Sequence, residues 1–122
     1  MSRIVIHDPN RDDGEILAML AGGWQEVITC RDCKALVAAL AERPPDVLVY
    51  VIENLVEDLR LLATVRRVAP MLPIILLGGS TDLVARRSIQ ELKPTYYGVF
   101  PLDKSELMDA VHGALQRARA AH

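Results

Sequence analysis

Five short apolar runs rich in β-branched residues alternate with longer segments of helical period along the chain, and this alternation limits the possible folds most strongly. The runs cover residues 3–7, 26–29, 46–52, 73–77 and 96–100. The third and fourth runs are apolar almost throughout, as in strands with both faces covered. Strands that alternate with helices form parallel sheets. The sequence therefore predicts an α/β fold, a five-stranded parallel sheet in doubly wound, flavodoxin-like order with helices on both faces.

Each segment between or after the runs carries signals for one helix, such as an apolar stripe, a capping side chain or a terminating Pro or Gly. The first predicted helix carries Ile16, Leu17 and Leu20 on its apolar face, and the second is capped by Asp32 and ends before the prolines at 44–45. The third covers 56–68. The fourth is capped by Ser80 or Thr81 and ends before Pro94, and the fifth starts with the capping pair Asp103 and Glu106.

Length and composition fit one domain that covers residues 1–122. A hydrophobic share of 51% with only 4% aromatic residues makes the core aliphatic. The formal net charge is −2, and the longest basic runs are the pairs 66–67 and 86–87. Because nucleic acid attracts a concentrated basic surface, we expect no direct nucleic-acid partner.

Targeting signals are sparse. No apolar stretch approaches the length of about 18 residues that spans a bilayer, so we expect neither a membrane segment nor a signal peptide. Two cysteines are too few for a secreted disulfide scaffold, which favours a reducing cytoplasm. The alanine- and arginine-rich residues 116–122 are typical of a helix that runs toward a linker, so an output domain that follows the chain is an open alternative.

The pair Cys30 and Cys33 offers an enzymatic alternative, because a CxxC pair at the start of a helix can hold a thiol of lowered pKa. Against a thiol redox module, the order of strands and helices differs from that of thioredoxin-like chains. Asp32 would also oppose a thiolate, and there is no second CxxC for zinc. We expect ordinary packing at both cysteines.

Other candidates for chemistry are weak. His7, His112 and His122 are scattered, with no Ser or Cys partner fixed by spacing, so no catalytic triad is predicted. Residues 78–80, Gly-Gly-Ser, precede a predicted helix whose first amides would suit an anion, but a plain turn is the simpler interpretation.

The segments RPPDVLVYV, LPIILLGG and VFPLDKSELMDAV resemble those of the response-regulator receiver domain (CheY-like), and the order of elements is similar over essentially the whole chain. In that family two acidic residues after the first strand hold magnesium, and an aspartate at the end of the third strand accepts phosphate. A hydroxyl residue ends the fourth strand, and a lysine before proline ends the fifth. These groups neutralise the charge of the transferred phosphoryl group.

The corresponding positions in this chain lack that chemistry. They are Asp8 and Pro9 (His7 and Asp8 if the register slips by one), Val51, Gly78 and Phe100. Valine carries no nucleophile, glycine offers no hydroxyl, and phenylalanine offers no cation. The resemblance therefore implies a degenerate pseudo-receiver that lacks the phospho-acceptor aspartate.

One carboxylate is a poor site for an ion that prefers several oxygen ligands, so we expect no magnesium site, no cofactor and no enzymatic activity. Glu53 would mimic a phosphorylated aspartate only if the third strand were shifted by two residues, which the spacing does not require. We further expect Val51 and Phe100 to close the former pocket with apolar contacts.

Two further features follow from the resemblance. Three residues before the lysine position, the family has an aromatic side chain that moves with activation. Tyr97 occupies this position here, and its simpler role is to cover the sheet. The bond between Phe100 and Pro101 matches a lysine-proline bond that is usually cis, and we predict a cis bond.

The resemblance implies an atypical receiver of bacterial two-component signal transduction and phosphorelays, which would act through phosphorylation-independent protein binding. The partner, or a second copy of the chain, would meet the fourth helix, the fifth strand and the last helix. Charged residues there suit symmetric salt bridges, although solvated surface charge is the default; they are Arg86, Arg87, Asp103, Lys104 and Asp109. The alternatives are a regulatory domain that restrains a fused transcription activator or kinase, and the thiol redox module.

Overall fold

Five parallel strands form one sheet in the order β2-β1-β3-β4-β5. The computed structural model describes residues 2–9, 16, 26–79 and 83–120. Its strands are β1 (Arg3–His7), β2 (Glu26–Cys30), β3 (Val47–Val51), β4 (Ile74–Gly78) and β5 (Tyr96–Val99). Its helices are α2 (Cys33–Glu42), α3 (Leu55–Val68), α4 (Leu83–Glu91) and α5 (Lys104–Ala120). The predicted α/β class and doubly wound, flavodoxin-like order are confirmed.

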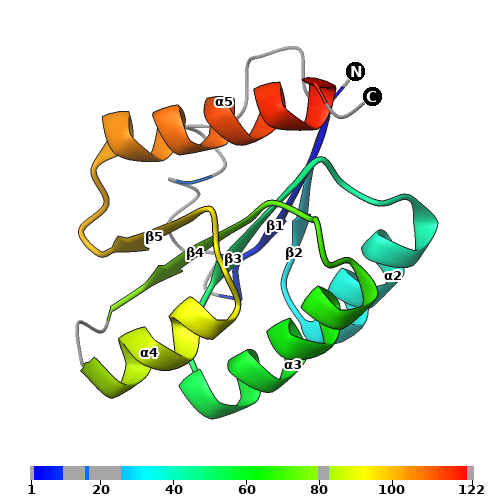
Figure 1. Cartoon of the computed structure of the whole chain (residues 1–122). Helices are drawn as coiled ribbons and strands as arrows, with labels where there is room; N and C mark the ends of the chain where they lie inside the picture. The colour runs from blue at the N-terminus through cyan, green and yellow to red at the C-terminus, as the bar shows by residue number, and fades with distance from the viewer. Residues whose placement is uncertain (1, 10–15, 17–25, 80–82, 121–122) are drawn as a thin grey trace.

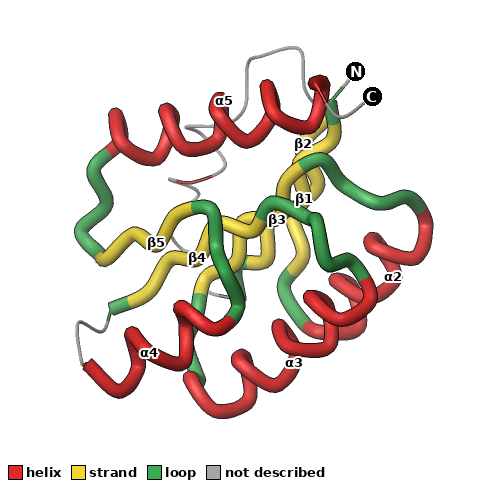
Figure 2. The backbone as a smooth tube through the Cα atoms, viewed as in Figure 1, coloured by secondary structure: helices red, strands yellow, loops and turns green. Residues whose placement is uncertain are grey.

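Helices lie on both faces of the sheet, with α5 on one side and α2, α3 and α4 on the other (Figures 1 and 2). Each face has its own apolar core. The first core joins alternate strand residues, such as Ile6 and Val49, to Leu107 and Val111 of α5. The second joins the strand residues of opposite parity to α2, α3 and α4, with Leu62 of α3 fully buried. Because side chains alternate along a strand, residues that neighbour each other in sequence face different cores.

Capping side chains fix the helix starts. The Asp32 carboxylate accepts a hydrogen bond from the backbone N–H of Ala35, at 2.7 Å, and Asp103 accepts one from Glu106, at 3.0 Å. Both caps were predicted. Of the first predicted helix, Ile16 is helical and buried, whereas Leu17 and Leu20 lie outside the described residues. The predicted cap at Ser80 or Thr81 also lies outside them, as does Ser80 of the predicted turn.

Arg66 of α3 ties three chain segments together. Its guanidinium donates hydrogen bonds to the carbonyl oxygens of Leu72 at 2.6 Å and Leu92 at 2.9 Å, with further bonds to Ala69, Pro70 and Lys93. These carbonyls belong to the end of α3, the loop before β4 and the end of α4, where backbone acceptors have no partner within their own helix. Arg66 is therefore a structural residue, not part of a free basic surface.

Among the described ranges, no helix has both the length and the apolar character needed to cross a bilayer.

Candidate functional site

The carboxyl ends of the strands form the edge where open α/β sheets place their chemistry. Val51 and Gly78 are the last residues of β3 and β4, and Asp8 and Phe100 follow β1 and β5. The backbone N–H of Phe100 donates to the Gly78 carbonyl oxygen at 3.0 Å, which holds these strand ends side by side. The bond between Phe100 and Pro101 is cis, as predicted. The structure therefore places the predicted positions, with Pro9 next to Asp8, at one edge of the sheet.

Val51 belongs to the apolar core under α5. Its side chain is 6% exposed and lies in the same cluster as Leu77 and Leu107. Phe100 is 37% exposed and is not among the hydrophobic residues packed against that core. The expected closure of the former pocket by both residues is therefore wrong for Phe100, because its side chain projects toward solvent.

The donor set does not suit the magnesium ion that receiver domains hold here. A hard cation takes several oxygen ligands. Asp8 brings a carboxylate, whereas Pro9 and Val51 bring hydrocarbon. Among the described residues, no group of three or more His, Cys, Asp or Glu side chains is placed to hold a metal. Of the described positions predicted for the metal, Asp8 is the one with a carboxylate, and Pro9 and Val51 do not supply the further oxygen ligands that magnesium needs.

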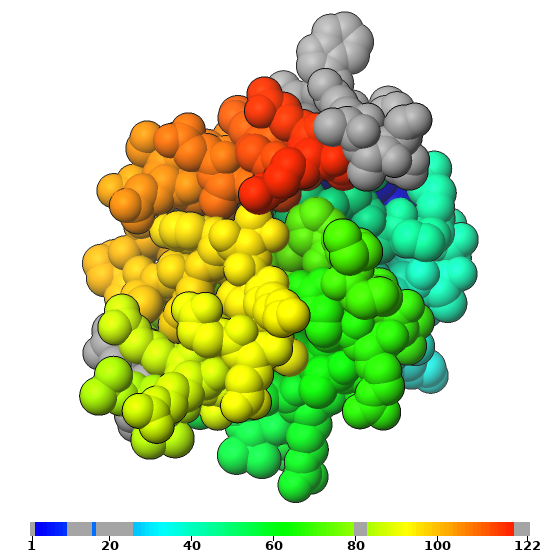
Figure 3. All heavy atoms as spheres, in the orientation of Figure 1, coloured from blue at the N-terminus to red at the C-terminus, as the bar shows by residue number. Residues whose placement is uncertain are grey.

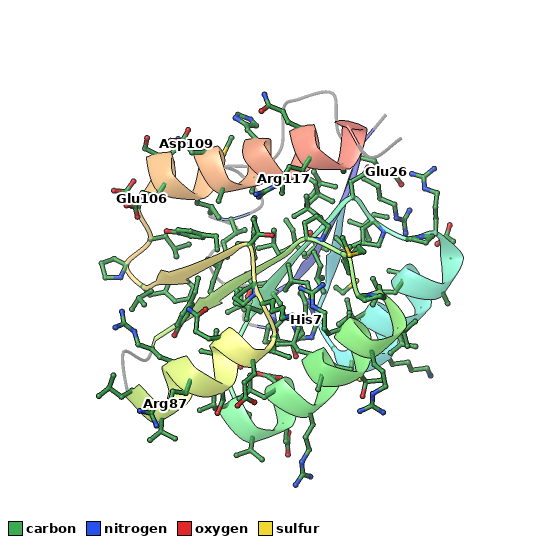
Figure 4. The ribbon with its side chains drawn as sticks, viewed as in Figure 1. His7, Glu26, Arg87, Glu106, Asp109 and Arg117 are labelled. Atoms are coloured by element: carbon green, nitrogen blue, oxygen red, sulfur yellow. The ribbon has the colours of Figure 1, made fainter. Side chains whose placement is uncertain are left out.

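A linked unit of His7, Tyr50 and Asp58 lies at the same edge, and Tyr50 belongs to the core that α2 and α3 cover. Figure 4 labels His7 on this side of the sheet. The rings of His7 and Tyr50 stack, with centroids 4.3 Å apart and planes 10° from parallel. The Tyr50 hydroxyl donates to Asp58 Oδ1 at 2.6 Å. Asp58 Oδ2 accepts from the backbone N–H groups of Glu53 at 2.9 Å and Asn54 at 3.0 Å. One carboxylate therefore joins β3 to the start of α3.

Burial dominates the electrostatics of this unit. It lowers the pKa of His7 from its ordinary value, although the charges of Asp58, Asp8, Asp32 and Glu53 act in the opposite direction. Burial raises the pKa of Tyr50, and the hydrogen bond to Asp58 raises it further. His7 is 5% exposed, and its Nδ1 makes no hydrogen bond within the described part of the chain. The unit therefore stacks an imidazole whose pKa is lowered on a phenol whose pKa is raised, and the phenol donates to one carboxylate.

Tyr50 was predicted only as part of the third apolar run, and no role was predicted for Asp58. A signal was present in the spacing. A Tyr near the end of a buried strand needs a partner for its hydroxyl, and an Asp in the first turn of the following helix is well placed to provide one. His7 was considered as a possible ligand or base, but its stacking on Tyr50 indicates a packing role.

The two cysteines have different surroundings. Cys30 ends β2 and is buried, whereas Cys33 begins α2 and is exposed. Burial raises the pKa of the Cys30 thiol, and the Asp32 charge adds to this. Because thiol chemistry needs an accessible thiolate, this geometry disfavours a redox role for Cys30.

The predicted interaction residues lie on α4 and around the start of α5. All five are exposed: Arg86, Arg87, Asp103, Lys104 and Asp109. In Figure 4, Arg87 projects from α4, and Glu106 and Asp109 project from α5. Figure 3 shows the yellow-green atoms of α4 and the orange atoms of α5 on one side of the molecule. This face therefore carries Arg86 and Arg87 on α4, and charges of both signs around the start of α5.

A groove runs between α4 and β5 on that face. It is lined by Leu83, Arg86, Arg87, Gln90, Glu91 and Tyr97. Tyr97 is half-buried and packs against the core under α2, α3 and α4. The aromatic identified from the sequence therefore lies beside the proposed interaction residues.

No family model matches the sequence, and no curated protein matches it. Solved structures match it over nearly its whole length. A signal receiver domain of an HD domain-containing protein from Pseudomonas fluorescens Pf-5 is 24% identical, with a TM-score of 0.83 and 98% of each chain covered. A CheY-like response regulator receiver domain protein from Methanospirillum hungatei JF-1 is 16% identical, with a TM-score of 0.86, 100% of this chain and 99% of that chain covered. The chain has the receiver-domain fold of response regulators.

At these identities the likeness establishes the fold and not the activity. A receiver fold can also form part of a longer chain. NtrX from Brucella abortus is 20% identical to this chain, with a TM-score of 0.83, and the match covers 99% of this chain but 28% of NtrX.

Proposed function

We propose that this chain is an atypical receiver domain of two-component-type signalling that binds a protein partner without phosphorylation of an aspartate. The observation that carries the proposal is Val51. A buried hydrocarbon side chain stands at the end of β3, at the position where the family resemblance implies the phospho-acceptor. Gly78 and Phe100 at the neighbouring strand ends bring neither a hydroxyl nor a cation. The chain would accordingly act by binding and not as an enzyme.

The test is incubation with a small-molecule phosphodonor and magnesium, followed by intact mass measurement. A receiver domain that carries the aspartate, the acidic pair, the hydroxyl and the lysine serves as positive control. We expect no added phosphate on the unmodified chain, and any adduct to be confined to the Val51→Asp variant. An adduct on the unmodified chain that hydroxylamine removes would refute the proposal, because acyl phosphates react with hydroxylamine and another carboxylate would then be the acceptor.

The partner surface that fits best is the face formed by α4, β5 and α5. Its charges suit a second copy of the chain, since a two-fold axis would bring Arg87 on α4 of one copy against Glu106 and Asp109 on α5 of the other. The exposed residues Arg87 and Asp109 represent the two charges (Figure 4). Exposed ion pairs contribute little individually, so such an interface would also need the apolar Leu83 and Val84, which are 73% and 72% exposed.

Self-association is tested by light scattering after size exclusion, over a range of concentrations. The charge reversals Arg87→Glu and Asp109→Lys should each weaken a dimer, and together they should restore it. Arg60→Glu on the exposed side of α3 is the matched control. If the chain stays monomeric at all concentrations, the same variants are tested against candidate protein partners.

The alternative is a regulatory domain that restrains a fused output domain. The match to part of the longer NtrX chain favours keeping this alternative. Comparing the activity of a full-length protein with and without this domain would distinguish the two, since restraint predicts higher output after deletion.

A further inference from the structure

A second groove lies between α3 and α4, on the face of the sheet that α5 does not cover (Figures 1 and 2). Its floor is apolar. Leu92, directly after α4, is buried, and Leu59 of α3 is half-buried and packs against the core beneath. Ala63 of α3 is exposed between them and carries only a methyl group, so the middle of the groove stays open. The groove therefore offers hydrocarbon to the side chains of a partner.

The α3 side of this groove is basic. Arg60, Arg66 and Arg67 line it, whereas Glu91 is the acidic residue on the α4 side. The chain as a whole has a formal net charge of −2, so this gathering of positive charge does not follow from composition. Arg60 and Arg67 are exposed, and neither forms an ion pair within the described ranges. The dipole of α3 accounts for a cation in the last turn, as at Arg67, but not for Arg60 in the middle of the helix.

Arg66 fixes the width of the groove at one end. Its guanidinium donates hydrogen bonds to the carbonyl oxygens of Leu92 at 2.9 Å and Lys93 at 3.3 Å, and so connects the end of α3 with the end of α4. In the part of the chain that the structure describes, these carbonyl dipoles and no carboxylate face its charge, so Arg66 adds to the positive potential of the groove. A surface whose walls are already connected binds with a smaller entropic cost than one that must first become ordered.

The spacing of the two exposed arginines suits a helix. Arg60 and Arg67 are seven residues apart, so they lie on the same side of α3, about 10.5 Å apart along the axis at a rise of 1.5 Å per residue. Residues i and i+7 of a partner helix have the same separation, and residues i+3 and i+4 lie between them on that face. Ala63 lies between the two arginines, so apolar side chains at i+3 and i+4 of a partner would reach the floor.

We propose that the groove between α3 and α4 is a docking site for an acidic amphipathic helix of a partner protein, with two carboxylates that meet Arg60 and Arg67 and apolar side chains that cover Ala63. The site is separate from the face formed by α4, β5 and α5, because Arg87 and Tyr97 line the groove on the other side of α4. The inference therefore goes beyond the proposed function and does not depend on it.

The probe is an acetylated and amidated helical peptide, rich in Ala and Gln, in which two Glu stand seven residues apart with two Leu between them on the same face. One reference peptide carries Lys in place of both Glu. A second has the same composition with Glu and Leu on opposite faces. Binding is measured at low salt by the fluorescence anisotropy of the labelled peptide as the chain is titrated. We expect saturable binding of the first peptide that added salt weakens, and at least fivefold weaker binding of both references.

Variants locate the binding site. Arg60→Glu should weaken binding of the acidic peptide at least fivefold, whereas the matched charge reversal Arg31→Glu, on the exposed loop before α2, should change it less than twofold. Ala63→Gln should weaken binding at least threefold, because it fills the floor without changing the charge. Ala41→Gln on the exposed side of α2 is its control. Circular dichroism checks folding, and should Arg60→Glu lose helix content, Arg60→Gln replaces it, with an expected loss of at least twofold.

Four results would overturn the inference. Two concern the peptides: no saturable binding of the acidic peptide, or equal binding of either reference peptide. Equal losses in Arg60→Glu and Arg31→Glu would show attraction to the whole chain and not to the groove. Unchanged binding in Ala63→Gln would show that the apolar floor takes no part.

The outcome stays separate from the tests of the proposed function. Arg60→Glu is expected to leave self-association unchanged, so loss of peptide binding with retained self-association would assign the two partners to different faces. A chain that stays monomeric and still binds the acidic peptide through Arg60 would refute the dimer alone. A chain that self-associates but fails to bind the peptide would refute the groove alone.

Discussion

The hydrogen bond between Tyr50 and Asp58 should contribute measurably to stability. Tyr50 is 1% exposed, and its hydroxyl donates to Asp58 Oδ1 at 2.6 Å. A hydrogen bond to a charged group contributes about 1.5–3 kcal/mol, and a buried hydroxyl that loses its acceptor costs about 1–3 kcal/mol. Replacing either partner should therefore destabilise the chain, and by different amounts.

The two substitutions differ in what they leave behind. Tyr50→Phe keeps the stacked ring and leaves Asp58 bonded to two backbone N–H groups, so we expect a loss of about 1–2 kcal/mol. Asp58→Ala leaves the buried hydroxyl without its acceptor and frees those N–H groups toward solvent, so we expect about 2–4 kcal/mol. In the Tyr50→Phe background, Asp58→Ala should cost only about 1 kcal/mol, because no hydroxyl is left unsatisfied.

The assay is urea unfolding followed by circular dichroism, with the free energy of unfolding extrapolated to water. Glu57→Ala is the control, because Glu57 is exposed and lies in the same first turn of α3. A loss in Asp58→Ala no greater than in Glu57→Ala would refute the reasoning. So would a coupling energy of zero in the double-mutant cycle.

Three further predictions concern residues outside that hydrogen bond. Burial lowers the pKa of His7 below its unfolded value of 6.5, so the unfolded chain binds more protons than the folded chain near that pH. The free energy of unfolding should therefore be fully retained above pH 6.5 and should fall below it, by up to about 1.4 kcal/mol per pH unit. The His7→Phe variant should lack this part of the pH dependence. Arg66→Ala should lower the free energy of unfolding by about 2–4 kcal/mol, and the control Arg67→Ala by less than about 0.5 kcal/mol. Both are measured by denaturant titration, and equal losses would contradict the structural role of the Arg66 guanidinium. Under native conditions iodoacetamide should modify the exposed Cys33, whereas the buried Cys30 should react only after urea unfolds the chain. The labelled residues are identified by mass spectrometry, and fast labelling of Cys30 in the folded chain would favour the redox alternative.

The fold was predictable because each strand and helix carries its own local signal. The buried run that became β3 is apolar at every position from Val47 to Val51, and Asp32 caps α2 as its position suggested. The cis bond before Pro101 was predictable from the family pattern. These features depend on a few neighbouring residues, which is what a sequence displays directly.

The details of the site were harder because they depend on how side chains meet across the sheet. Tyr50 and His7 belong to different strands, and no local pattern indicates that their rings stack. The exposure of Phe100 could not be inferred from its apolar character, since the loop after β5 sets its direction. The roles assigned to Arg86, Arg87 and Tyr97 stay predictions, because they depend on a partner.

At the carboxyl edge of this sheet, the end of β3 is occupied by the buried apolar side chain of Val51. In a receiver that is phosphorylated, the buried carboxylates at the carboxyl edge repel one another. Their burial and repulsion lower the stability of the fold, and a bound metal cation offsets this cost. Val51 removes one such charge and adds apolar burial. If the chain works as proposed, phosphate cannot switch it at this edge, and its binding face does not depend on phosphorylation.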